Sequence, residues 1–201
     1  IEPRGLTVAL QGLGNVGYHF ARIAEEELGV KIVAAATSHA LVHASEGVDV
    51  GSLPYSRTVG KDIAQRGNVE EADPSEIIGW DADILVCAAI EDVVTTDNQA
   101  SIKAGILLEL ANGPVSDDAL LALSDRGVVV IPDVVANAGG VTVSYLEWKQ
   151  NKSGEHWTES RVNDEMKEVL IGATHDLMKR ASDEGCSLKE AAFLIALERL
   201  G

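Results

Sequence analysis

A glycine-rich turn between a buried strand and a helix restricts the fold of this chain more than any other feature of its sequence. The aliphatic run Thr7–Gln11 predicts a strand, and a turn over Gly12–Gly17 follows it directly. Val16–Leu28 then shows the i, i+3, i+4 spacing of a helix that ends at Gly29, and Lys31–Ala36 reads as a second buried strand. A strand, a turn, a helix and a strand within about 30 residues form a βαβ unit.

The turn has the sequence Gly12-Leu13-Gly14-Asn15-Val16-Gly17, a G-x-G-x-x-G spacing that is typical of dinucleotide-phosphate binding. Gly12 permits the tight turn, Gly14 leaves room for the pyrophosphate, and Gly17 lets the helix pack closely on the strand. The N–H groups of Asn15 and Val16 then face the phosphates at the positive end of the helix. Nineteen glycines also produce such spacings by chance, so a glycine turn without a ligand is the alternative.

Composition favours a parallel sheet that helices cover on both faces. Hydrophobic residues make up 46% of the chain but aromatic residues only 4%, so Val, Ile, Leu and Ala must build the core. Further aliphatic runs predict strands at Ile84–Ala89, Ile106–Leu110 and Val128–Ile131, with a helix over Asp117–Ser124. We therefore predict an α/β fold, a Rossmann-type, doubly wound, mainly parallel sheet with a C-terminal helical extension.

The segments outside these runs give weaker or purely helical patterns. Residues 39–80 are the least regular, and short helices are expected in Leu53–Arg66 and Pro74–Ile78, with another ending at Ser101–Ala104. The later segments are a loop at Ala136–Gly140 and helices over Val141–Gln150, from Thr158 to Glu184, and over Leu188–Leu200, where Ser187 and Glu190 form a capping box.

The polar connector Asn151–Glu155 is the expected boundary between a dinucleotide-binding domain, residues 1–150, and C-terminal helices, residues 151–201. The chain begins at Ile1 without a methionine and enters a strand almost at once. We therefore expect both parts to belong to one excised piece of a longer protein.

Charge and the lack of long apolar runs exclude several classes of partner. The chain has 32 acidic and 16 basic residues and a formal net charge of −16, which argues against binding to nucleic acid or to an anionic membrane. No apolar run reaches the ~18–20 residues of a membrane span, and no signal peptide is visible. We expect a cytoplasmic protein.

The two cysteines do not suggest a metal site. Cys87 and Cys186 are about a hundred residues apart and form no metal-ligand spacing. Cys87 lies in an aliphatic run, so we expect a buried thiol in a reducing compartment and no bound metal.

The residues after the second strand bear on which cofactor binds. A carboxylate at this position would favour NAD through the ribose 2′-hydroxyl, but the strand is followed by Thr37, Ser38 and His39. The two hydroxyls can donate hydrogen bonds to a 2′-phosphate, and His39 can add positive charge. We therefore expect NADP or NAD with a preference for NADP; the alternative is that the three residues are ordinary solvated loop.

Several short motifs lie within or directly after the predicted strands and helices. They are the Gln11–Gly17 turn, Ala88-Ala89-Ile90-Glu91, Ala111-Asn112-Gly113-Pro114, Pro132–Val141, Thr142–Trp148 and Trp157-Thr158-Glu159. In this order they resemble the C-terminal nucleotide-binding domain of the glutamate dehydrogenase family, from about Gly5 to Gly201. The resemblance implies NAD(P)-dependent oxidative deamination of L-glutamate to 2-oxoglutarate and ammonia, in a parent protein that is a homo-hexamer.

The same resemblance implies roles for particular residues. Asn112 and Asn137 would lie beside the nicotinamide and its ribose, where an amide offers both a donor and an acceptor. Val141 and Ser144 match substrate-pocket positions, with Ser144 at the side-chain carboxylate of glutamate. The residues that would line the nicotinamide side are Ala88, Ala89 and Ile90. Turn geometry at the two asparagines and a helix-surface position for Ser144 are the alternatives.

The family's acid/base lysine and aspartate belong to an N-terminal substrate domain that no part of this sequence resembles. We therefore expect no catalytic residue in this chain, which would bind nucleotide but turn over nothing alone. Two other hypotheses stay open: the coenzyme domain of a leucine, phenylalanine or valine dehydrogenase, and a stand-alone nucleotide-binding sensor module. Ser144 favours glutamate, because the branched-chain and aromatic enzymes need no hydroxyl for a distal carboxylate.

Overall fold

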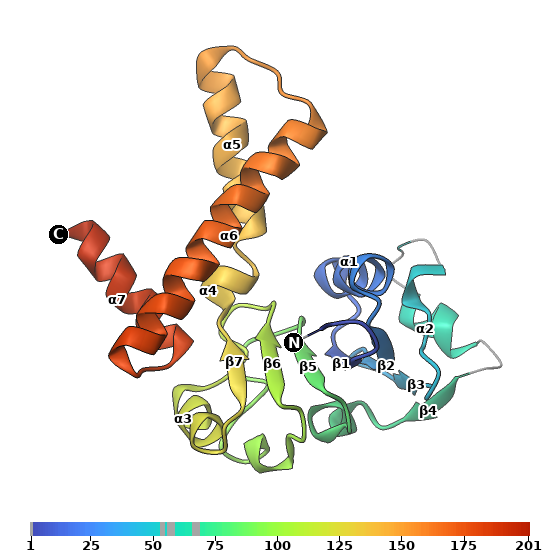
Figure 1. Cartoon of the computed structure of the whole chain (residues 1–201). Helices are drawn as coiled ribbons and strands as arrows, with labels where there is room; N and C mark the ends of the chain where they lie inside the picture. The colour runs from blue at the N-terminus through green and yellow to red at the C-terminus, as the bar shows by residue number, and fades with distance from the viewer. Residues whose placement is uncertain (1, 53–54, 56–58, 66–68) are drawn as a thin grey trace. The chain divides into compact units, whose positions relative to one another are not determined.

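The computed structural model describes residues 2–52, 55, 59–65 and 69–201. The chain divides into two compact units, Ile1–Val130 and Ile131–Gly201, and we describe each by itself (Figure 1).

A seven-stranded sheet in the order β4-β3-β2-β1-β5-β6-β7 forms the centre of the first unit (Figure 1). The pairs β1–β2, β1–β5 and β5–β6 are parallel, whereas β2–β3 and β3–β4 are antiparallel. The strands are β1 Thr7–Gln11, β2 Lys31–Ala36, β3 Leu41–His43, β4 Glu70–Ala72, β5 Ile84–Cys87, β6 Ile106–Glu109 and β7 Val129–Ile131. Chain order reverses between β1 and β5, which is where an open α/β sheet binds its ligand.

The first helix of this unit begins within the glycine-rich turn. Helix α1 spans Asn15–Ile23, continues as a π-helical turn over Ala24–Leu28, and ends at Gly29 with a left-handed φ of 66°. The other helices are η2 Val50–Ser52, α2 Val59–Ala64, η3 Pro74–Gly79, η4 Gln99–Ser101 and α3 Asp117–Asp125, the η elements having 3-10 geometry. Parts of the helix expected in Leu53–Arg66 lie outside the described residues.

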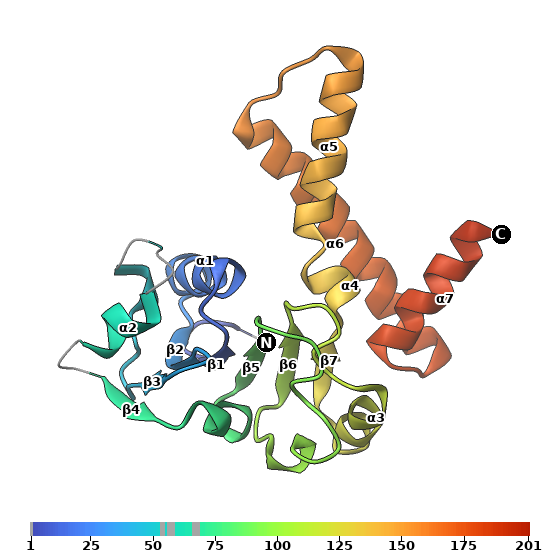
Figure 2. The ribbon, with the colours of Figure 1, turned by 180° about the vertical axis from the view of Figure 1, so that it is seen from behind.

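Alternate residues of the strands point into two separate hydrophobic clusters, one on each face of the sheet. On β1, Val8 and Leu10 join the cluster that Tyr18 of α1 completes, whereas Ala9 joins the cluster that holds Leu123 of α3. Figures 1 and 2 show α1 and α3 on opposite sides of the sheet. The expected doubly wound α/β fold is therefore confirmed.

Several predicted elements were wrong at their limits. Strands β3 and β4 were missed because three residues each are too few to show a period. Strand β5 ends at Cys87 rather than Ala89, and β6 ends at Glu109 rather than Leu110. The loop expected at Ala136–Gly140 is partly helical, because glycine costs little in a first helical turn whose N–H groups have no intrahelical partner.

The second unit consists of helices whose ends follow ordinary capping chemistry. They are α4 Asp133–Ala136, α5 Gly139–Ser153, α6 Glu159–Glu184 and α7 Leu188–Leu200. Thr158 accepts the Arg161 N–H at the start of α6, and Ser187 with Glu190 forms the predicted capping box of α7. Gly154 and Gly185 end α5 and α6 with left-handed φ values of 71° and 64°.

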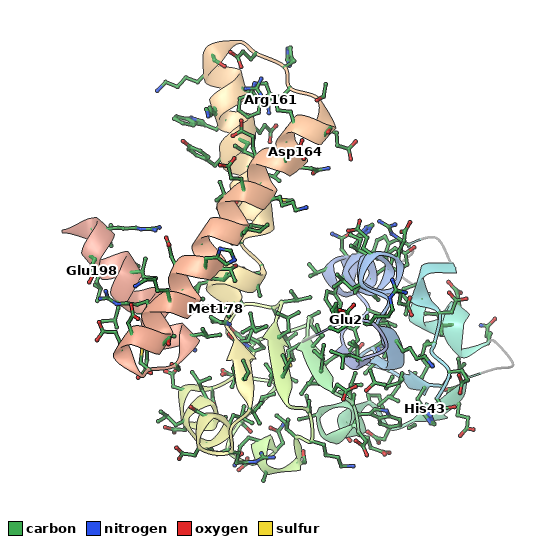
Figure 3. All side chains as sticks on the ribbon, in the orientation of Figure 1. Glu2, His43, Arg161, Asp164, Met178 and Glu198 are labelled. Carbon is green, nitrogen blue, oxygen red and sulfur yellow. The ribbon has the colours of Figure 1, made fainter. Side chains whose placement is uncertain are left out.

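Helices α5 and α6 lie side by side in both ribbon views (Figures 1 and 2). Close to the turn that joins them, the Arg161 guanidinium lies 3.9 Å from the centroid of the Trp157 ring (Figure 3). Glu198 of α7 forms an ion pair with Arg180 of α6. Because α5 packs on α6, the division between the units lies at residues 130 and 131, whereas the sequence placed a domain boundary at residues 150 and 151.

One hydrogen-bonded pair ties the starts of β1 and β5 together. Thr7 donates from its backbone nitrogen and its hydroxyl to Asp83 Oδ2, at 2.7 Å in each case, and accepts the Asp83 N–H at 2.9 Å. The hydrogen bonds from the Thr7 backbone, then those from its side chain, lower the pKa of Asp83. Folding is therefore favoured by the ionised carboxylate.

We predict that Asp83→Ala lowers the free energy of unfolding by about 1–2 kcal/mol at pH 7. Since the folded pKa lies below the unfolded value, this contribution is complete above the unfolded pKa and is lost as the pH falls through the folded pKa. Urea unfolding at several pH values measures it, with Asp81→Ala as a control at an exposed neighbouring carboxylate. An equal loss in both variants would contradict the prediction.

Candidate functional site

Most of the residues predicted to form a site lie at one edge of the sheet in the first unit. The glycine turn follows β1, Thr37–His39 follows β2, Ala88–Ile90 follows β5, and Asn112 follows β6. Because these strands are parallel, their carboxyl ends meet at the same edge. The structure thus brings four segments together that are up to a hundred residues apart in the sequence.

Two glycines of the turn are in positions where no side chain fits. Gly12 has a φ of 102°, and a Cβ there would lie 2.8 Å from Ala89 Cβ and 2.9 Å from the backbone of Ala88. A Cβ on Gly17 would lie only 1.8 Å from the carbonyl oxygen of Gly12. The turn therefore packs against α1 on one side and against the segment after β5 on the other.

Gly14 differs from these two because it faces open space. A Cβ there would have no neighbour within 4 Å, and its φ of −74° suits any residue. Gly14 is also the N-cap of α1 and makes no side-chain capping bond. Exposed Asn15 and Val16 follow it in the first turn of the helix. This surface offers backbone N–H groups and a helix dipole to an anion, which fits a pyrophosphate.

Thr37 has a different role from the one the sequence suggested. Its hydroxyl accepts the N–H groups of His39 and Ala40 at 3.2 and 3.1 Å and donates to the Ala40 carbonyl at 3.2 Å. The hydroxyl therefore closes the turn after β2 and is already committed. Ser38 and His39 are exposed, with Ser38 Oγ 2.5 Å from His39 Nδ1.

The segment after β5 forms hydrogen bonds with the last residue of β1. Ala88 is half-buried, and Ala89 and Ile90 are exposed. The Ala88 N–H donates to the Gln11 carbonyl at 2.7 Å, and the Ala89 N–H donates to Gln11 Oε1 at 3.3 Å. Strand β5 ends at Cys87, and the Ala89 N–H bonds to the Gln11 side chain and not to the backbone of a neighbouring strand.

Asp92 and Gln11 have structural roles that the sequence did not reveal. Asp92 has a positive φ of 50°, unusual for a residue other than glycine, and its N–H donates to the Gly113 carbonyl at 2.9 Å. That bond fixes the loop beside exposed Asn112. Gln11 carried no signal beyond its place before the glycine turn, because its contact is with a residue 78 positions away.

A buried carboxyl and a buried thiol lie next to each other beneath this edge. Glu109 and Cys87 are register partners on β6 and β5, and both are 0% exposed. Burial, and after it the charge of Glu109, raises the pKa of the Cys87 thiol to about 12. The expectation of a buried thiol is confirmed, and Cys87 stays protonated and unreactive at neutral pH.

The remaining predicted site residues belong to the second unit. Asn137 is half-buried and forms the C-cap of α4, and Val141 is exposed on the first turn of α5. Ser144 is exposed on the same helix, and its hydroxyl donates to the Gly140 carbonyl at 3.1 Å. A hydroxyl bonded to its own helix can rotate toward a ligand at small cost.

Metal-binding clusters and membrane-spanning helices are both lacking among the residues that the structure describes. In the part of the chain that the structure describes, no group of three or more His, Cys, Asp and Glu residues could hold a metal ion. None of the described helices combines the length and the apolar character needed to cross a bilayer. A hollow of about 480 Å³ lined by Ser75, Trp80 and Lys103, among others, precedes β5 and β6 and so lies at the opposite edge of the sheet.

The whole chain, residues 1–201, matches the family described as Glutamate/Leucine/Phenylalanine/Valine dehydrogenase. It is 38% identical over 196 residues to the NADP-specific glutamate dehydrogenase A1 of Halobacterium salinarum, covering 96% of this chain and 47% of that protein. It is 37% identical over 199 residues to an NAD-specific glutamate dehydrogenase of Staphylococcus aureus, covering 99% and 48%. The chain spans about half the length of the curated relatives it matches.

A solved structure gives a similar comparison. The hetero-hexameric glutamate dehydrogenase from Thermus thermophilus superposes with a TM-score of 0.88 at 32% sequence identity. The match covers 100% of this chain and 47% of that one.

Alanine should affect stability at Gly17 but cofactor binding at Gly14. Gly17→Ala forces a Cβ against the Gly12 carbonyl, so it should lower the free energy of unfolding by about 2–3 kcal/mol. Gly14→Ala should change stability by only about 0.5 kcal/mol but weaken NADPH binding about tenfold, because its methyl group would occupy space that a bound pyrophosphate needs. Urea unfolding and fluorescence titration separate the two effects; equal stability losses would contradict the assignment.

Proposed function

Because the chain belongs to the glutamate/leucine/phenylalanine/valine dehydrogenase family, we propose that it is the nucleotide-binding part of a glutamate dehydrogenase. The complete protein would oxidise L-glutamate to 2-oxoglutarate and ammonia with NAD or NADP, and run the reverse reaction. The observation that carries the proposal is the close contact between the glycine turn and the segment after β5, at the topological switch point of the sheet. The names of the relatives support glutamate as the substrate.

The residues of the first unit would bind and orient the cofactor. Backbone N–H groups at Asn15 and Val16 would hold the pyrophosphate, which the chain needs to do locally because its overall charge is −16. Ala88, Ala89 and Ile90 would flank the nicotinamide, with Asn112 beside its ribose. When bound, the nicotinamide accepts a hydride from the α-carbon of the amino acid.

The residues of the second unit would contact the substrate and the nicotinamide ribose. Asn137 would serve the ribose, and Val141 and Ser144 would line the substrate pocket. Exposed Ser144 can donate a hydrogen bond to the distal carboxylate of glutamate, which leucine, phenylalanine and valine lack. This hydroxyl favours a glutamate enzyme over the branched-chain and aromatic members of the family.

We further propose that residues 1–150 and the helices after them act as one nucleotide-binding region. For the complete protein we propose a homo-hexamer. The relative from Thermus thermophilus is a hetero-hexamer, so hexameric assembly has support, whereas identity of the subunits is our inference. Native mass spectrometry of the complete protein tests both the number of subunits and their identity.

No residue of this chain matches the lysine and aspartate that would polarise and deprotonate the substrate, so we propose that residues outside these 201 supply them. The chain alone should bind NADPH or NADH but show no glutamate-dependent cofactor reduction. The complete protein should turn over glutamate in preference to leucine, phenylalanine and valine, measured as kcat/KM from absorbance at the reduced-nicotinamide band. Preference for leucine, phenylalanine or valine would favour the alternative enzymes, and cofactor binding without any turnover would favour a sensor module.

For the cofactor we propose a preference for NADP through Ser38 and His39. Neither residue is a carboxylate and both are exposed after β2, whereas the Thr37 hydroxyl is held within the turn. Relatives specific for NADP and for NAD both occur, so family membership alone leaves the choice open.

We predict that Ser38→Asp lowers kcat/KM for NADP at least about tenfold, since a carboxylate repels the 2′-phosphate. Ser38→Asn is the control of matched size without the charge and should keep most of the NADP activity. Initial rates with both cofactors measure the effect in the complete protein. A wild-type preference for NAD, or equal losses in the two variants, would contradict this assignment.

A further inference from the structure

The glycine turn and the segment after β5 touch each other over several backbone atoms. The Cβ positions of Gly12 and Gly17 are occupied by backbone or side-chain atoms of Ala88, Ala89 and Gly12 itself. If the two segments separated, this contact would be lost, and if they approached, atoms would overlap. Their spacing is therefore closely defined on the side of Gly12.

Gln11 controls the same spacing from the other side. Its backbone carbonyl accepts the Ala88 N–H at 2.7 Å as the last bond of the β1–β5 ladder. The chain then turns away at Gly12, where φ is 102°. The half-buried Gln11 side chain extends the connection by one residue, because its Oε1 accepts the Ala89 N–H at 3.3 Å.

We propose that Gln11 is a positioning residue for the cofactor: its side-chain oxygen holds the Ala88–Ala89 backbone in register with the phosphate turn. The inference rests on the proposed function, in which the turn binds the pyrophosphate and Ala88–Ile90 flank the nicotinamide. A dinucleotide has a fixed length between these two groups, so both anchoring segments must keep a fixed separation. Gln11 sets the place of the nicotinamide without touching it.

This role requires an acceptor at a particular distance from the main chain. Glutamate keeps that acceptor at the same length, methionine keeps the length but offers only a weak sulfur acceptor, and asparagine keeps the amide one methylene shorter. If the Gln11 side chain only filled space, any side chain of similar volume could replace it. These substitutions therefore separate positioning from packing.

The test compares two ligands in the complete protein. NADPH contacts the whole site, whereas 2′-phospho-ADP-ribose carries the 2′-phosphorylated adenosine and the pyrophosphate but no nicotinamide. NADH and ADP-ribose form the corresponding pair without the 2′-phosphate. Affinities come from fluorescence titration and competition, together with kcat for glutamate oxidation and the thermal midpoint. Gln150→Met is the matched control, because Gln150 Oε1 also accepts a backbone N–H, that of Trp157 at 2.6 Å, but in the second unit.

Gln11→Met should reduce NADPH affinity and kcat each about tenfold, the effect of one lost hydrogen bond, and leave 2′-phospho-ADP-ribose affinity within about twofold. Gln11→Glu adds a charge near the phosphates and should weaken both ligands equally, so their affinity ratio stays that of the unaltered protein. Gln150→Met should leave the ratio unchanged. If Gln11→Met does not fold, Gln11→Asn takes its place with the same expected change in ratio.

Equal losses of both ligands in Gln11→Met, with the ratio unchanged, would overturn the positioning role and leave a packing role. Full retention of NADPH affinity and kcat in that variant would overturn it as well. If the unaltered protein binds neither NADPH nor NADH, the proposed function itself fails, and this inference fails with it.

Discussion

The structure depends on how closely the backbone after β1 approaches the backbone after β5. A Cβ on Gly12 would lie within 2.9 Å of Ala88 and Ala89, and a Cβ on Gly17 would strike the Gly12 carbonyl at 1.8 Å. Only glycine permits both contacts, because any side chain would push helix α1 and the next strand apart. This approach places the N-terminus of α1 beside the carboxyl ends of β1 and β5, at the point where the sheet reverses its order.

The same geometry explains how a strongly acidic chain can bind an anionic cofactor. A formal net charge of −16 repels phosphates at long range, but salt screens this repulsion beyond about 10 Å. At contact distance, the N–H groups and dipole of α1 dominate, since Gly14 leaves them uncovered. Beneath the site, Cys87 and Glu109 are buried, and the raised pKa of Cys87 keeps its thiol protonated at neutral pH.

Prediction from the sequence succeeded where local patterns carry the information. The strands β1 and β2 and helix α7 were predicted with their observed limits, because aliphatic runs, glycine stops and the Ser187–Glu190 capping box are local signals. Strands β3 and β4 gave no such signal, since three residues cannot display a period. Thr37 was predicted to face a 2′-phosphate, yet its hydroxyl is used by a turn that only the folded backbone defines.

The sequence by itself determined that the glycine turn connects a strand to a helix, and that Ile90 and Asn112 follow later strands. Only the tertiary structure decided that Ala89 lies against Gly12 and donates to the side chain of Gln11. The physical reason is range: helix and strand periods arise from contacts between residues close in sequence. Ala88 and Ala89, which contact Gln11 and Gly12, lie more than seventy residues away and are placed there by strand order, which no local pattern encodes.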